Sequence, residues 1–301
     1  MSNSPVHSAC LNCGASLQGP YCAQCGQHDV DYHRSLWFIV EDSLESFFHF
    51  DGKFLSTVRI LFTRPGFLTQ EFNSGRRVRY SNPLRFYIFA SFLSFFITAF
   101  VGKFAFVAGP QTAGEVANKS GDAAPNANGV SPERQSEGSS RRDRMSNWIK
   151  TVASPQILKS KAFPKELIHL VPEALFICVP LLALLLKVAY IRSNRVYVEH
   201  LIFALHIQTF YLLATLVGEV IDLCFRPIIN GPVPGLQKIV SLFILYVIYR
   251  SFRVVYRQGV AKTLLKASAV GVCYSIIVAL ALLSTALISA LIVSHDSLPV
   301  K

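Results

Sequence analysis

The stretch Ala267–Ser294, ASAVGVCYSIIVALALLSTALISALIVS, decides the fold class because it holds no charged residue over 28 positions. About 20 apolar residues in a helix cross a bilayer, so this segment is long enough to cross with tilt. The whole chain is 51% hydrophobic and only 16% charged, with a mean hydropathy of +0.39. Soluble domains carry about 25% charge. The composition therefore predicts an integral membrane protein.

Four further apolar segments precede this stretch. They are Phe86–Gly102, about Leu167–Ile191, Leu201–Gly218 and about Val233–Tyr249. The first has 17 uncharged residues, at the lower limit for a crossing, and Lys238 interrupts the fourth. The sequence thus predicts an all-α multi-pass helix bundle of about five transmembrane helices.

Basic residues orient these segments. They cluster before the first segment, between the second and third, and between the fourth and fifth. The link between the third and fourth segments and the tail after the fifth hold few. Lys and Arg favour the cytosolic side, so five crossings place the N-terminus in the cytosol and the C-terminus outside. Without the fourth crossing, the basic cluster at 250–266 would face outward.

Two matching cysteine motifs open the chain, Cys10-x-x-Cys13-Gly14 and Cys22-x-x-Cys25-Gly26. Two residues between paired cysteines let both thiolates reach one tetrahedral ion near 2.3 Å, and the following glycine permits a tight turn. This spacing favours one structural zinc ion bound by all four thiolates. A thioredoxin-like redox pair and a disulfide are the alternatives, and a reducing cytosol disfavours the disulfide.

A zinc site closed by four thiolates is structural, not catalytic. We expect this zinc ribbon to dock a protein partner or to sense state. The net charge is +11, yet no Lys or Arg precedes Arg34, so the ribbon is poorly suited to nucleic acid. No phosphate-binding loop, nucleophile elbow or His-x-x-x-His motif is present, and we predict no enzyme activity.

Composition and periodicity divide the chain. Residues 109–144 are rich in Gly, Ser, Asn and charge, which predicts a disordered loop, placed outside by the topology. Apolar residues at helical spacing within 34–75 predict two amphipathic helices, lying either on the cytosolic leaflet or against the bundle. The predicted order is zinc ribbon 1–31, interfacial helices 32–82, first transmembrane helix 83–108, external loop 109–144, loop or amphipathic connector 145–166, four-helix transmembrane bundle 167–294 and tail 295–301.

Ionisable residues in the apolar segments are candidates for an intramembrane polar site. Glu199 and His206 are seven residues apart on one helical face. Glu173, Glu219 and Asp222 are expected near the outer surface. A transporter or channel using these groups is the alternative function. The simpler explanations are an ion pair of Glu199 at the cytosolic interface, a hydrogen bond from His206, and a surface pair of Asp222 with Arg226.

Three arginines precede the first crossing, Arg76, Arg77 and Arg79. They suit anionic lipid headgroups, and the predicted orientation alone also accounts for them.

Several stretches together resemble a bacterial integral-membrane family of unknown function that carries an N-terminal zinc ribbon. They are YCAQCGQ (21–27), FLSTVRILFTRPG (54–66), GRRVRYSNP (75–83) and EHLIFALH (199–206). The resemblance covers most of the chain outside 109–144. It implies a bacterial inner-membrane protein with a cytosolic ribbon, and it implies no activity.

Overall fold

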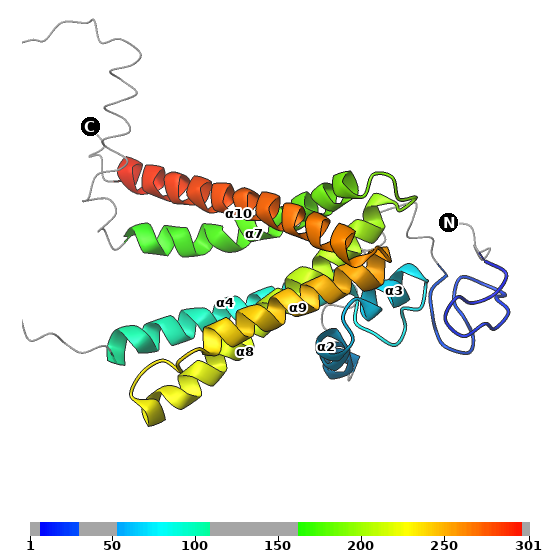
Figure 1. The fold of residues 1–301 in the computed structure, drawn as a ribbon, viewed down its shortest axis with the longest axis horizontal. Helices are drawn as coiled ribbons and strands as arrows, with labels where there is room; N and C mark the ends of the chain where they lie inside the picture. Colours follow the sequence, from blue (N-terminus) through cyan, green and yellow to red (C-terminus); the bar gives the residue numbers. More distant parts are fainter. Residues whose placement is uncertain (1–6, 30–52, 109–161, 297–301) are drawn as a thin grey trace, which may run out of the picture.

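The computed structural model describes residues 7–29, 53–108 and 162–296 (Figure 1). Within these ranges the chain is helical, except for the N-terminal cysteine module and the connecting turns. The helices are α2 (Lys53–Thr63), α3 (Phe67–Asn73), α4 (Pro83–Ala108), α7 (Ala162–Ala189), α8 (Tyr197–Ile229), α9 (Leu236–Tyr256) and α10 (Val260–Asp296).

Each of the five apolar segments falls on a helix, which confirms the helical fold class. Three helices, α8, α9 and α10, are long and apolar enough to cross a membrane. Helices α4 and α7 contribute shorter apolar stretches among the described side chains, Pro83–Thr98 and Ala174–Ala189. Membrane-type helices are therefore present, and the number of five crossings stays a prediction.

The helices form two groups that meet at one end (Figure 1). Helix α7 packs along α10, and α4 and α9 pack along α8. The groups converge toward the end that carries α2, α3 and the N-terminal module, and they diverge toward the other end. Buried aromatic and aliphatic side chains from α4, α7 and the turn after it, α8 and α9 fill the convergent end, among them Tyr87, Leu186, Tyr190, Phe203 and Phe252.

Helix α2 buries one face against the bundle. Leu61 and Thr57 are buried, and Phe54 stacks edge-on against Phe86. Leu55, on the other face, is 76% exposed. The amphipathic helices were predicted to lie either on the cytosolic leaflet or against the bundle. Packing against the bundle accounts for the buried face of α2. The first predicted amphipathic helix, the loop 109–144, most of the connector 145–166 and the end of the tail lie outside the described residues.

Helix α8 is longer than the apolar segment that predicted it. It continues past Gly218 for another three turns and ends at Ile229, with Pro227 inside its last turn. A hydrogen bond of 2.8 Å joins Arg226 Nε to Asp222 Oδ2 one turn away and supports this polar extension.

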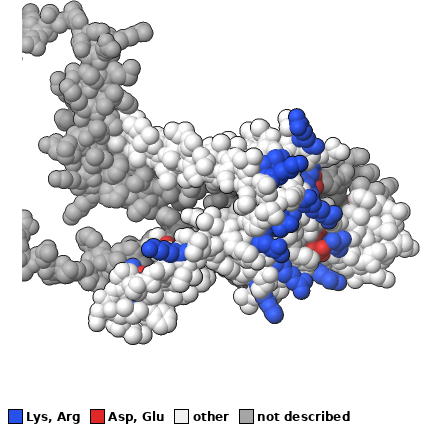
Figure 2. All heavy atoms as spheres, viewed as in Figure 1, with Lys and Arg blue, Asp and Glu red and all other residues white. Residues whose placement is uncertain are grey.

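Lys and Arg side chains gather at the convergent end (Figure 2). They lie over α2, α3 and the junction between α9 and α10, close to the N-terminal module. The opposite end of the described bundle carries few. The basic clusters that the sequence places in three separate links therefore meet on one end of the molecule.

Candidate metal centre

The N-terminal module is built from two copies of one turn, twelve residues apart in the sequence (10 to 22, 13 to 25). In each copy, the glycine after the second cysteine donates its N–H to the carbonyl of the first, at 2.8 Å for Gly14 and 2.9 Å for Gly26. These glycines have φ of 79° and 72°, left-handed values that disfavour other residues. The first cysteine of each pair donates its own N–H five residues ahead, at 2.7 Å and 2.9 Å. The expected tight turns are confirmed.

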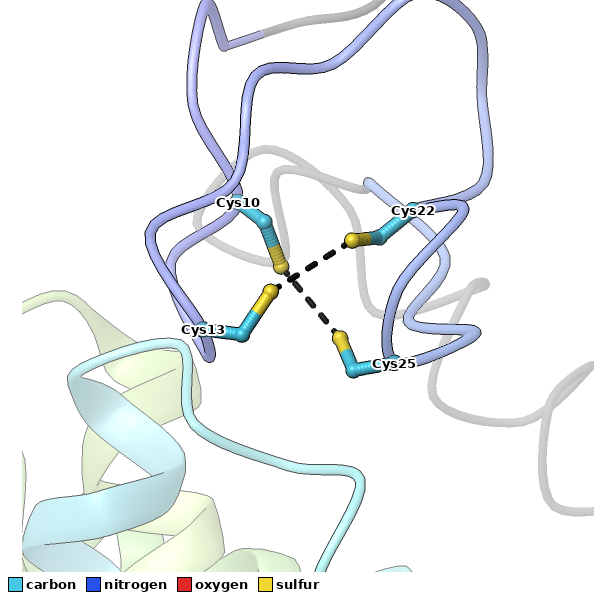
Figure 3. Close-up of side chains that lie close together, drawn as sticks. All are labelled: Cys10, Cys13, Cys22 and Cys25. Carbon is cyan, nitrogen blue, oxygen red and sulfur yellow. Dashed lines mark hydrogen bonds between the residues drawn. The ribbon is translucent and has the colours of Figure 1, made fainter.

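The four sulfur atoms converge on one point (Figure 3). All lie within 4.8 Å of one another. The closest pairs, Cys10 Sγ–Cys25 Sγ and Cys13 Sγ–Cys22 Sγ, are each 3.5 Å apart. Sulfur atoms about 2.3 Å from a tetrahedral ion lie about 3.8 Å from each other, whereas a disulfide needs about 2.05 Å. The arrangement therefore suits a shared metal ion.

Both close pairs join the first turn to the second (Figure 3). A redox pair would instead use the two cysteines of one motif. The four thiols therefore form one cluster that can bind a metal ion.

Local contacts close the module around this set. Cys10, Leu17 and Cys22 are buried together. His7 and Asp29 join the two ends of the module, with the His7 backbone N–H donating to Asp29 Oδ2 at 2.8 Å and the His7 ring Nδ1 2.6 Å from Oδ1. So small a core leaves the ligands to supply most of the cohesion.

The thiols differ in proton affinity. Backbone N–H groups, chiefly that of Cys25, lower the pKa of Cys22 to about 7. The Ala15 amide acts in the same direction on Cys13, but desolvation and the three neighbouring thiols raise the pKa of Cys13 to about 12. Without a cation the cluster keeps protons, and a divalent ion provides the charge that stabilises four thiolates.

The module contacts the turn between α3 and α4. The Gln27 side chain donates from Nε2 to the Gly75 carbonyl at 2.7 Å and accepts the Arg77 backbone N–H at 3.3 Å. Gly75 has φ of 80°, and a Cβ atom added there would lie 2.5 Å from Leu11 Cδ1. Sequence reasoning missed this contact because it joins residues 48 positions apart, and the only local signal was the glycine.

Two of the three arginines, Arg76 and Arg77, have protein partners. Arg76 forms an ion pair with Glu71, which raises the pKa of its guanidinium, and the Arg77 guanidinium lies 5.2 Å from the Phe72 ring centre. Arg79 is exposed. Binding of lipid headgroups by these residues stays a prediction.

Glu199 and His206 have separate partners. Glu199 accepts the Val196 backbone N–H at 3.0 Å and pairs with Arg195 at 3.2 Å, which caps the start of α8. The His206 ring Nδ1 lies 3.0 Å from the Thr69 hydroxyl of α3, and both side chains are buried. The ion pair of Glu199 is therefore present, with Arg195 as its partner, and its place at the cytosolic interface stays a prediction. Thr69 was missed because nothing local to it indicates a partner in α8.

The carboxylates near the other end are also engaged. The Thr98 hydroxyl donates to Glu219 at 3.0 Å. Asp222 pairs with Arg226 and accepts the Val233 backbone N–H at 2.8 Å, which ties the end of α8 to the turn before α9. Glu173 lies in α7 among residues whose side chains the structure does not describe. Its approach to the other two carboxylates stays a prediction.

A further buried histidine was not among the predicted site residues. His200 is fully buried, its Nδ1 lies 2.8 Å from the Tyr256 hydroxyl, and its Nε2 has no partner among the described atoms. A histidine next to a capping glutamate gives no sequence signal for this contact.

Fold and site together define a helical protein with membrane-type spans and a four-cysteine cluster able to hold a metal ion. Residues 51–95 match a family described as a protein of unknown function (DUF3667). This match begins just before α2, includes the Gly75 turn and ends within α4, so it does not include the cysteines. No curated protein and no solved structure matches the chain.

Proposed function

We propose that the chain is a bacterial inner-membrane protein of five crossings whose cytosolic N-terminal module binds one structural Zn²⁺ and docks a protein partner. The observation that carries the proposal is the pairing of thiols between the two turns, at 3.5 Å for both pairs. A set of four thiolates favours zinc or an iron–sulfur centre over hard cations. Zinc is proposed because a tetrahedral four-thiolate zinc site is a common closed, structural arrangement.

Metal content of the full chain, purified in detergent under reducing conditions, tests the zinc proposal. We expect one zinc ion per chain and no iron. The double variant Cys10→Ser/Cys22→Ser removes two ligands and should lose the ion, whereas Cys224→Ser, an exposed cysteine outside the cluster, should keep it. Retention of zinc by the double variant would contradict the proposal.

An exposed aromatic pair supports partner docking. Tyr21 is 61% exposed and stacks on the exposed His28 ring, with ring centres 4.5 Å apart. Tyrosine is enriched where proteins bind each other, because its ring is large and rigid and its hydroxyl is polar. This pair lies in the second turn, and the metal-bound fold would hold it in place.

Quantitative comparison of proteins that co-purify with the intact chain tests docking. A specific partner should be lost from Cys10→Ser/Cys22→Ser and weakened by Tyr21→Ala. Gln18→Ala changes an exposed residue of the same module and serves as the matched control. A set of co-purifying proteins that is the same for all four chains would refute docking through this module.

The alternative function, a transporter or channel, has weaker support. Glu219, Asp222 and His206 each have a structural partner. The cavity beside His206, lined also by Arg64, Thr69 and Ser251, has a volume of about 10 Å³, room for about one water molecule. Ion flux in vesicles that falls in Glu219→Gln and Asp222→Asn would favour this alternative.

A further inference from the structure

The contact between the cysteine module and the Gly75 turn comes from within the metal-binding turns. Gln27 closes the second turn, because its backbone carbonyl accepts the Cys22 N–H at 2.9 Å. The side chain of the same residue makes both hydrogen bonds to the Gly75–Arg77 segment. The position of that side chain therefore depends on the fold of the second turn.

The first turn makes the matching apolar contact. Leu11 lies between Cys10 and Cys13, and its side chain covers Gly75 closely enough to exclude a Cβ atom. One contact thus comes from each turn. Among the described residues, the two turns are joined by their close thiols, by the shared burial of Cys10, Leu17 and Cys22, and by the His7–Asp29 contact. A module that lost its metal would lose the alignment of Leu11 with Gln27.

The other side of the contact is fixed to the helices. Before the Gly75 turn, α3 is held by the Thr69–His206 pair and by Gln70, whose Nε2 donates to the Val254 carbonyl at 2.7 Å. After the turn, the Ser81 N–H donates to the Thr57 hydroxyl of α2 at 3.1 Å. The Gly75–Arg77 segment is thus a preformed surface, with one carbonyl and one N–H directed at the module.

We infer that Leu11 and Gln27 form a metal-dependent clamp on Gly75–Arg77, so that the metal-loaded module is docked on its own chain and the metal-free module is released. The inference rests on the proposed metal binding. The occupant of the Gly75 surface is the module itself, and release would free the Gly75 carbonyl and the Arg77 N–H at the start of the basic segment.

Hydrogen–deuterium exchange of the full-length protein in lipid nanodiscs tests the clamp. In Gln27→Ala we expect peptides covering 74–80 to exchange roughly tenfold faster, the size expected for the loss of one or two net hydrogen bonds. Metal content should remain that of the wild type, because Gln27 supplies no ligand. Chelation of the metal from the wild type should produce the same acceleration.

Two comparisons make the test specific. Gln24→Ala changes an exposed glutamine of the same turn and should leave exchange at 74–80 unchanged. Gly75→Ala should release the module, because the new Cβ meets Leu11 and the φ of 80° disfavours alanine. Adding Leu11→Ala to Gly75→Ala should not restore the protection, because Leu11 Cβ itself would lie 2.9 Å from the new Cβ.

The outcomes separate the clamp from the metal proposal. A wild-type chain without metal would overturn the metal proposal and the clamp with it. A chain that binds metal through the four cysteines, yet shows unchanged exchange at 74–80 in Gln27→Ala and after chelation, would overturn the clamp alone.

Discussion

The Thr69 hydroxyl and His206 Nδ1 lie 3.0 Å apart, both buried, where α3 meets α8. Taken alone, a histidine within an apolar helix suggests a functional group. The structure shows that His206 is one half of a hydrogen bond that attaches the short helix α3 to the bundle. The residue that changes the interpretation is 137 positions away in the sequence.

Thr69→Val should destabilise the protein by about 1–2 kcal/mol, because it keeps the side-chain shape and removes the hydroxyl that hydrogen-bonds to His206. Thermal unfolding in detergent should show a melting temperature lower by a few degrees. Thr63→Val, on the exposed end of α2, should change it by less than a degree or so. Equal effects of the two variants would argue against a buried Thr69–His206 bond.

The proton affinities of the thiols predict how metal binding depends on pH. The pKa of Cys13, about 12, keeps this thiol protonated in the metal-free module at any neutral pH, so binding always displaces its proton. Cys22, with a pKa of about 7, holds a proton mainly below pH 7, and metal binding there displaces a second proton. Affinity for Zn²⁺ should therefore fall as pH falls.

Competition titrations of the full chain with a zinc chelator measure this dependence. We expect the dissociation constant to rise at least about tenfold per pH unit between pH 8 and pH 6, and more steeply below pH 7. An affinity independent of pH would show that thiolates are not the ligands.

At the scale of elements, apolar length predicted where the helices lie. The end of α2 at Thr63 follows from Pro65-Gly66, and α10 contains the whole uncharged stretch from Ala267. The extension of α8 to Ile229 was not predicted, because its polar residues end the apolar segment while pairing within the helix. The seven-residue α3 was not predicted either, since so short a helix depends on tertiary contacts.

At the candidate metal centre, too, one part was predicted from the sequence and another was not. The four cysteines of the cluster were predicted from their spacing, because the chemistry of a tetrahedral ion restricts how far apart paired cysteines can lie. The docking of the module through Gln27 and Leu11 was not readable, because it depends on how distant segments pack.

Asp222 joins the end of α8 to the turn before α9. Its variants should therefore lower the stability by different amounts. Asp222→Ala leaves the Val233 N–H without its acceptor and should lower the melting temperature by several degrees, for a loss of about 1–3 kcal/mol. Asp222→Asn keeps an acceptor and should cost less. Ser241→Ala, on the exposed face of α9, is the control and should be nearly neutral. Identical losses for Ala and Asn would mean that the Arg226 pair, not the turn, carries the effect.

At the scale of the whole molecule, the gathering of Lys and Arg at the convergent end supports the proposed orientation (Figure 2). Reporter fusions at Asn3 and Gly259 should be cytosolic, and those at Gly129 and Lys301 external. A cytosolic reporter at Lys301 would require an even number of crossings, and α9, with Lys238 near its start, would be the segment to reassign.

Because the charges are separated along the bundle, the membrane potential affects how the protein inserts. With the basic end in the cytosol, each cation that crossed to the outside would move against a membrane potential that is negative inside, at about 2.3 kcal/mol per 100 mV. In that orientation, an energised membrane would add this cost for each cation to the cost that the bilayer itself imposes. Chains inserted while the potential is collapsed would lose that bias, and errors of insertion would concentrate in the spans with the fewest flanking charges.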